Sequence, residues 1–294
     1  MIVSLPKNIM LLYLKGVIFI LDIYRAQENY LYHFTSSDTC ISYILRDQKL
    51  RLSSINKTND PRENKEWYFG FGIAEEEIEL FEHMDSLNLN KQINELLKED
   101  AKLICFTKDK NVYDPNAINE VIKGCLRPRM WAQYGDSHKG ICLVFDQNKL
   151  ESKISNTFNS DVRFFGENVQ YSTDFHNLRL NIKFNSIKDD LEAGVYNHLS
   201  SYYKDLFFEK FIDWQDETEF RWVVFTKNES GFEYVDYQDS LVHIVLGADF
   251  NDAYLPLIKS YCEKFKVHCS KINWHNGIPL DMPIYDECTV ENSE

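Results

Sequence analysis

The order of strand-like and helical segments constrains this chain most, because the two kinds alternate irregularly. β-Branched and aromatic runs typical of strands occur at 31–35, 102–107 and 220–226, while apolar residues recur at helical spacing in 191–211 and 252–265. No strand–helix repeat and no other internal repeat is visible. The sequence therefore predicts an α+β fold with a mixed or largely antiparallel sheet flanked by helices. Further strands are expected at 49–53, 140–145, 162–171, 241–246 and 267–274, and further helices at 36–45 and within 73–100.

The length of 294 residues suits one large domain. We expect a hydrophobic extension or helix at 1–29, a single α+β domain at 30–285, and a flexible acidic tail at 286–294. The apolar run at 9–23 is interrupted by two charges and is too short for a membrane span of about 20 residues. A helix packed on the body, a membrane-surface segment and a signal peptide are the alternatives for it.

The charge balance narrows the choice of partner. There are 46 acidic and 32 basic side chains, a formal net charge of −14, which disfavours nonspecific attraction to nucleic acid. Seven cysteines without a C-x-x-C pair indicate reduced thiols in the cytoplasm. A zinc site could be drawn from four nearby side chains, but their spacing matches no common ligand pattern. These side chains are Cys262, His268, Cys269 and His275.

The usual motifs for nucleotide folds, phosphate loops, zinc proteases and serine hydrolases are absent. Two early segments could nevertheless carry chemistry. His33 lies on a predicted strand, with its side chain opposite those of its aromatic neighbours, and could donate to a ribose hydroxyl or be a structural histidine. The segment 59–63 presents Asp60, Arg62 and Glu63 on a turn, either to grip a polar ligand or metal or as a capped surface turn.

The segment 127–140 combines cations with flat rings. Arg129, Trp131, Tyr134 and His138 lie within it, and such a set suits a ligand with a pyrophosphate and a base. The alternative is a core tryptophan on a short helix that leads through a glycine turn into a strand.

Alternating side chains mark the segment 217–226. In a strand, Glu217, Glu219 and Arg221 would share one face, while Phe220 and Trp222 would share the other. The polar face could be solvated and held by charge pairs. Alternatively, it could hold a carboxylate against the positive charge of a glycosyl oxocarbenium ion.

Five motifs together resemble the bacterial domain-of-unknown-function family 2971. The resemblance covers about residues 31–274, and it implies no biochemical activity by itself. The motifs are N-D-P-x-E at 59–63, M-W-A-x-Y at 130–134, H-K-G-I-C-L-x-F-D at 138–146, E-x-E-x-R at 217–221 and V-x-x-V-L-G at 242–247.

A second resemblance concerns activity. L-Y-H-F-T at 31–35 and E-T-E-F at 217–220 resemble strands of ADP-ribosyltransferases of the histidine-bearing class and of their DNA-modifying toxin relatives. This resemblance implies an ADP-ribosyltransferase-like fold in which His33 holds the ribose of NAD and Glu219 is the catalytic glutamate. The tyrosine that usually accompanies them could be Tyr134 or Tyr171.

The same resemblance implies NAD as substrate and no metal. Glu217 would orient the acceptor or take its proton, Trp131 or Tyr134 would stack on nicotinamide, and an arginine would clamp the pyrophosphate. The acceptor could be nucleic acid, protein or water. A phage-defence or toxin protein with a cognate antitoxin or defence partner would fit. The residues expected to bind NAD are Asp60, Arg62, Arg129, Trp131, Tyr134 and His138.

Two other functions stay open. One is a non-catalytic module whose Trp131 pocket senses a nucleotide or binds a partner. The other is a nuclease or phosphodiesterase that uses Mg²⁺ or Mn²⁺. Its ligands would be Asp60, Glu63, His138, Glu217 and Glu219.

Overall fold

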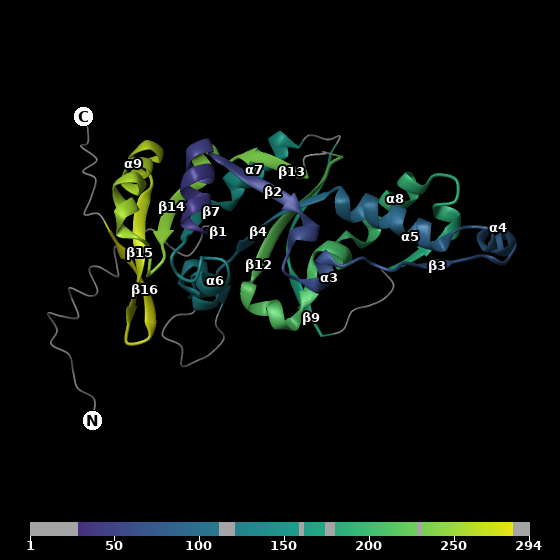
Figure 1. Ribbon diagram of the computed structural model, residues 1–294, viewed down its shortest axis with the longest axis horizontal. Coiled ribbons are helices and arrows are strands. Elements are labelled where there is room, and N and C mark those ends of the chain that lie inside the picture. The colour runs from purple at the N-terminus through teal and green to yellow at the C-terminus, as the bar shows by residue number, and fades with distance from the viewer. Residues whose placement is uncertain (1–28, 112–120, 159–161, 174–179, 228–230, 285–294) are drawn as a thin grey trace, which may run out of the picture. The chain divides into compact units, whose positions relative to one another are not determined.

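The computed structural model describes residues 29–111, 121–158, 162–173, 180–227 and 231–284 (Figure 1). The predicted acidic tail and, apart from Asn29, the predicted N-terminal extension lie outside these ranges. The chain divides into two compact units, each described by itself: unit 1 is Met1–Asp47, Asp109–Leu150 and Gln238–Glu294, and unit 2 is Gln48–Lys108 and Glu151–Tyr237. Both combine helices with a largely antiparallel sheet, which confirms the predicted α+β class. The predicted single domain at 30–285 stays a prediction.

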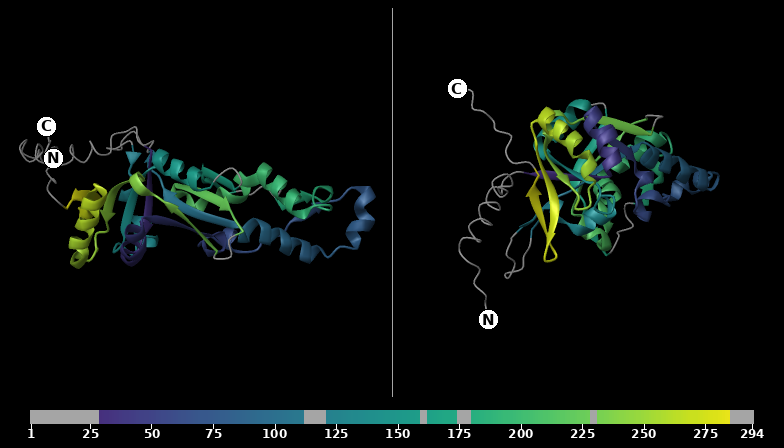
Figure 2. Two further views of the ribbon diagram at one scale, coloured as in Figure 1. Left: turned by 90° about the horizontal axis from the view of Figure 1, so that it is seen from above. Right: turned by 60° about the vertical axis from the view of Figure 1, so that its left-hand side comes forward.

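The sheet of unit 1 has the strand order β1-β7-β14-β15-β16. Neighbouring strands are antiparallel except β14 and β15, which are parallel and are joined through the helix α9. A parallel pair requires such a crossover, and α9 lies beside β15 (Figure 2). The strands are β1 (Tyr30–Thr35), β7 (Ile141–Asp146), β14 (Leu241–Leu246), β15 (His268–His275) and β16 (Ile278–Pro283).

The core of unit 1 is built around β7, in which Ile141 through Phe145 are fully buried. Such a continuous apolar run is typical of a strand covered on both faces. The predicted helix after β1 is present, and Ser36 caps it by accepting a hydrogen bond from the Thr39 N–H. The remaining elements are α2 (Ser37–Thr39), η1 (Cys40–Leu45), β5 (Lys110–Asn111), β6 (Val121–Ile122), η5 (Gly124–Leu126), α6 (Pro128–Gln133), η9 (Gln238–Ser240), η10 (Asp252–Tyr254) and α9 (Leu255–Phe265).

His243 is a buried histidine in this core, and it makes the stability of unit 1 pH-dependent. Its Nε2 lies 2.7 Å from Ser270 Oγ, and burial, assisted by the charge of His268, lowers its pKa to about 3. Between about pH 6.5 and pH 3 the unfolded state binds a proton that the folded state does not, so stability falls as the pH falls. We expect the free energy of unfolding to drop by up to about 1.4 kcal/mol per pH unit in that window.

Urea denaturation at several values between about pH 5 and pH 7, above the range where carboxylates titrate, measures this dependence. In His243→Gln the extra slope should disappear. Equal slopes in the two proteins would contradict the role of His243.

Unit 2 contains an antiparallel sheet of order β13-β2-β4-β12-β8, together with two small parallel pairs, β9 with β11 and β3 with β10. The sheet strands are β13 (Phe232–Asp236), β2 (Lys49–Ser54), β4 (Ala101–Thr107), β12 (Glu219–Phe225) and β8 (Arg163–Asn168). The paired short strands are β9 (Gln170–Ser172), β11 (Glu209–Phe211), β3 (Gly70–Gly72) and β10 (Asn181–Lys183). The helices are η2 (Ile55–Lys57), α3 (Pro61–Asn64), η3 (Glu75–Glu77), α4 (Ile78–Glu82), α5 (Ser86–Asn94), η4 (Glu95–Glu99), η7 (Phe184–Ser186), α8 (Leu191–Phe207) and η8 (Ile212–Glu217), while α7 (Gln147–Thr157) starts in unit 1 and ends in unit 2.

Strand β12 is the central element of unit 2, because it pairs with β4 on one side and β8 on the other and is buried throughout. One face contributes Val223 and Phe225 to an apolar core that also contains Phe207 of α8. On the other face, the ring of Trp222 contacts those of Phe106 and Phe220. The strand thus holds its side chains in fixed positions.

The structure offers no candidate for crossing a membrane within the described ranges, since every helix there is too short or too polar.

Candidate active site

The candidate site is built on β12, where Glu219 and Arg221 point to the same face. Glu219 Oε1 accepts from Arg221 Nε at 2.6 Å, and Oε2 accepts from Nη2 at 2.8 Å. This two-pronged pairing of a carboxylate with a guanidinium fixes both planes. Both side chains are almost fully buried.

Lys210 joins this pair to a second carboxylate. The ammonium of Lys210, on β11, lies 2.6 Å from Glu219 Oε2 and 2.8 Å from Glu217 Oε2. The alternation of side chains predicted that Glu217 lies on the same strand face as Glu219 and Arg221. In the structure, Glu217 does not lie on the strand. It ends the helix η8, and Thr218 then adopts a left-handed conformation with φ of 44° before β12 begins. The prediction of a shared strand face for Glu217 is therefore wrong, although its carboxylate still reaches the same ammonium.

Glu63 completes the network from α3. Its Oε1 accepts from Arg221 Nη1 at 2.5 Å, and the same nitrogen donates to the carbonyl of Phe207 at 3.1 Å. Helix α3 starts at Pro61, with Asp60 as its cap accepting from the Arg62 N–H at 2.9 Å. Among the described residues, the second oxygens of Asp60 and Glu63 are buried without a hydrogen-bond partner.

These five side chains, Glu63, Lys210, Glu217, Glu219 and Arg221, form what we call the buried ion cluster. Each is less than a tenth exposed. Its formal charge is 2 − 3 = −1, from two cations and three carboxylates. Burial opposes the charge of Glu219, but Arg221 and Lys210 outweigh it and hold the pKa of Glu219 well below its usual range. The carboxylates in turn overcome burial and hold the pKa of Lys210 and Arg221 above their usual ranges.

Tyr171 borders the cluster from β9. Its hydroxyl accepts a hydrogen bond from the backbone N–H of Glu219 at 2.9 Å. Burial, with the nearby charge of Glu219, raises the pKa of Tyr171. Of the two tyrosines considered from the sequence, Tyr171 is therefore the one that contacts Glu219 within unit 2.

Arg62 lies on the same helix as Glu63 but makes different contacts. Its Nη2 donates to the carbonyl of Asp205 at 2.7 Å and to Glu209 at 3.3 Å. Because Glu209 immediately precedes Lys210, this pair ties α3 to the strand that carries the ammonium. The sequence-predicted residues Asp60 and Arg62 thus belong to the elements that support the cluster.

The other predicted site residues belong to unit 1. His33 is half-buried on β1, and Tyr32 and Phe34 point from the opposite face into the core, as predicted. Trp131 is 1% exposed, its Nε1 donates to the carbonyl of Cys125 at 2.7 Å, and its ring contacts Phe34 edge-on. This environment matches the core-tryptophan alternative, and stacking on a ligand would require the indole to be uncovered. The predicted meeting of His33 with Glu219 stays a prediction.

The rest of the cation-and-ring segment surrounds the turn after α6. Arg129 is exposed and donates to Gln133 at 3.0 Å, and Tyr134 is half-buried at the end of the helix. His138 has a left-handed backbone, like its two predecessors, and its ring lies 6.2 Å from that of Trp274. A Cβ on Gly140 would lie 2.2 Å from the carbonyl oxygen of Thr35, so close packing of the backbone explains the glycine of the H-K-G motif.

An open pocket of about 760 Å³ lies elsewhere in unit 2, and none of the sequence-predicted site residues lines it. Within the described parts of the chain, no three His, Cys, Asp or Glu side chains are grouped so that they could hold a metal ion.

Lys210 is the main functional candidate that the sequence analysis missed. A weak signal was present, because Lys210 lies in the mostly apolar run F-F-E-K-F at 207–211, and a lysine that such a run buries needs a carboxylate partner. Glu63 had been considered as part of a ligand- or metal-binding turn and as a metal ligand, but not as a partner of Arg221.

The fold and the site define an α+β protein with a buried ion cluster on a central strand. Residues 130–222 match the model of a family described as "Protein of unknown function (DUF2971)". The match spans less than half of the chain, and over these residues it confirms the predicted resemblance to that family. It includes Lys210, Glu217, Glu219 and Arg221. No curated protein and no solved structure shows significant similarity to this chain.

Proposed function

We propose that the chain is an NAD-consuming enzyme of the bacterial cytoplasm, an ADP-ribosyltransferase or NAD glycohydrolase of a defence or toxin system. The observation that carries the proposal is the convergence of Glu217 and Glu219 on one ammonium, that of Lys210. Two carboxylates that hold a cation between them are suited to stabilise the positive charge that develops on a ribose. The contact of the Tyr171 hydroxyl with the backbone N–H of Glu219 also supports the proposal, because the resemblance implies a tyrosine in the same site as the glutamate.

The proposed reaction gives these residues the following roles. The bond between the ribose C1′ and the nicotinamide nitrogen breaks, and its electron pair leaves with neutral nicotinamide. Glu219 stabilises the oxocarbenium ion that forms. An acceptor, or water, forms the new bond to C1′ and gives its proton to Glu217. His33, Trp131, Tyr134, Arg129 and His138 keep their predicted roles in binding NAD as predictions.

Substrate binding has to open the cluster. Glu219 is 4% exposed, and both of its oxygens are engaged by Arg221 and Lys210. The proposal therefore requires the nicotinamide-side ribose, on which positive charge develops as the bond from C1′ to nitrogen breaks, to take the place of the Lys210 ammonium. That lysine lies on β11, a strand of three residues that pairs with β9 and is tied to α3 through Glu209 and Arg62, so its displacement must also loosen these contacts.

Incubation of the purified protein with NAD labelled in its adenylate part, with and without cell extract, tests the proposal. We expect release of nicotinamide and label transferred to protein or nucleic acid, or recovered as free ADP-ribose. Intact NAD under both conditions would contradict it. Cleavage of nucleic acid that a chelator abolishes, without NAD consumption, would favour the metal-dependent alternative.

A second candidate is a non-catalytic binding module, and the closed state of the cluster favours it. Here the ion pairs only fix β12, β11 and α3 against one another. Calorimetry that detects NAD or ADP-ribose binding without nicotinamide release would support this candidate.

A further inference from the structure

Several large apolar side chains are exposed at one end of unit 2. Helices η3 and α4 and the start of α5 lie at this end, beyond the rest of α5 and α8 (Figures 1 and 2). We call residues 73–87 the tip. Leu80 is 52% exposed and Leu87 is 76% exposed. The other exposed apolar side chains of the tip are Ile73, Ile78 and Met84.

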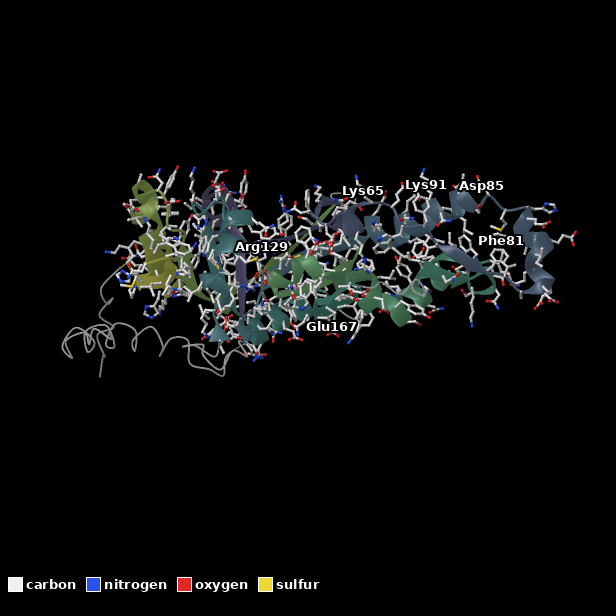
Figure 3. All side chains as sticks on the ribbon, turned by 90° about the horizontal axis from the view of Figure 1, so that it is seen from below. Lys65, Phe81, Asp85, Lys91, Arg129 and Glu167 are labelled. Atoms are coloured by element: carbon white, nitrogen blue, oxygen red, sulfur yellow. The ribbon has the colours of Figure 1, made fainter. Side chains whose placement is uncertain are left out.

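The tip is anchored rather than loosely attached. The ring of Phe81 lies 5.1 Å from that of Phe184 and 5.5 Å from that of Phe71. Glu77 is buried and pairs with Lys188 at 2.8 Å. In Figure 3, Phe81 lies inside the outline of the unit while Asp85 lies at its edge. Of the apolar side chains on α4, only Phe81 packs against the core, so Ile78 and Leu80 remain on the outside.

The charge on the tip has one sign. The sequence from residue 67 to residue 90 contains no lysine or arginine. Lys188 neutralises Glu77 by pairing with it. Within the described ranges, no ion pair involves the remaining acids of the tip. Those acids are Glu75, Glu76, Glu79, Glu82 and Asp85.

We propose that the tip is a docking surface for a basic amphipathic segment of another protein. Exposed apolar side chains interspersed with charges of one sign are typical of a protein interaction site. These acids select a cationic partner by charge complementarity. They repel nucleic acid, an anionic membrane and a second copy of this chain, whose own net charge is −14. The inference is independent of the NAD proposal.

Fluorescence anisotropy with a labelled amphipathic peptide of leucine and lysine, about 14 residues long, tests this inference on the full chain. We expect binding that weakens as salt rises. Leu80→Ser combined with Leu87→Ser should raise Kd by about tenfold or more, because it removes two apolar anchors. Glu79→Gln combined with Glu82→Gln should raise Kd and flatten its salt dependence.

Matched controls locate the binding. Leu257→Ser changes another exposed leucine, 40% exposed and on α9 of unit 1, and should leave Kd unchanged. A leucine–glutamate peptide should not bind. All substituted side chains are exposed, so circular dichroism should show a native fold in each variant. Unchanged Kd in both tip variants, or no binding of the basic peptide, would overturn the proposal. A dimer that dissociates when Leu87 becomes serine would also overturn it, by assigning the surface to a second copy.

Discussion

Arg221→Met is expected to lower the free energy of unfolding by about 3–5 kcal/mol. Arg221 is 1% exposed and donates to both oxygens of Glu219, to Glu63 and to a backbone carbonyl. Methionine fills similar space but leaves three buried carboxylates, those of Glu63, Glu217 and Glu219, with Lys210 as the remaining cation of the cluster. Burying an uncompensated charge destabilises the folded state by more than the apolar contacts of methionine stabilise it. Urea denaturation followed by circular dichroism measures the loss.

Lys227→Met is the matched control. Lys227 also pairs with a glutamate, Glu192 at 2.7 Å, but both side chains are about half exposed or more. Breaking an exposed pair costs about 0–1 kcal/mol. The double variant Arg221→Met with Glu219→Met should recover part of the loss, because it removes a stranded charge as well. A loss for Arg221→Met no larger than that for Lys227→Met would show that the cluster does not hold the fold together.

The alternation at 219–225 explains why sequence reasoning located this strand. Phe220 and Trp222 do lie on one face and Glu219 and Arg221 on the other. The sequence could not reveal that the polar face is buried, because its covering groups come from distant segments. Glu63 lies 158 positions before Arg221. A local sequence pattern predicts which side chains of a strand share a face, but not which distant residues pack against that face.

Two differences between the predicted and the observed elements have physical explanations. Strand β16 contains Pro279 and Pro283, which argue against a strand in sequence and are tolerated because β16 is the last strand in the sheet order of unit 1. The helix predicted at 191–211 ends at Phe207, because residues 209–211 pair with β9 instead. That pairing brings Lys210 to the cluster, so tertiary contacts override the helical pattern at the point that matters for the site.

Glu219→Gln is expected to lower NAD turnover by about 10²–10³-fold if the proposed function is right. The amide keeps the shape of the side chain and one acceptor oxygen, but it carries no charge to stabilise the oxocarbenium ion. The variant should fold with reduced stability, because Arg221 and Lys210 lose a shared carboxylate. Nicotinamide release is therefore measured well below the unfolding transition of the variant.

Glu63→Gln separates the catalytic role of Glu219 from a structural one. Glu63 contacts Arg221 in the same cluster, but the ammonium of Lys210 lies between Glu217 and Glu219. Both variants should lose stability, since each removes a carboxylate from buried Arg221. Only Glu219→Gln should lose turnover by the larger factor. Equal activity in the two variants would assign Glu219 to the fold alone, because a carboxylate that stabilises the transition state cannot be replaced by an amide without slowing the reaction.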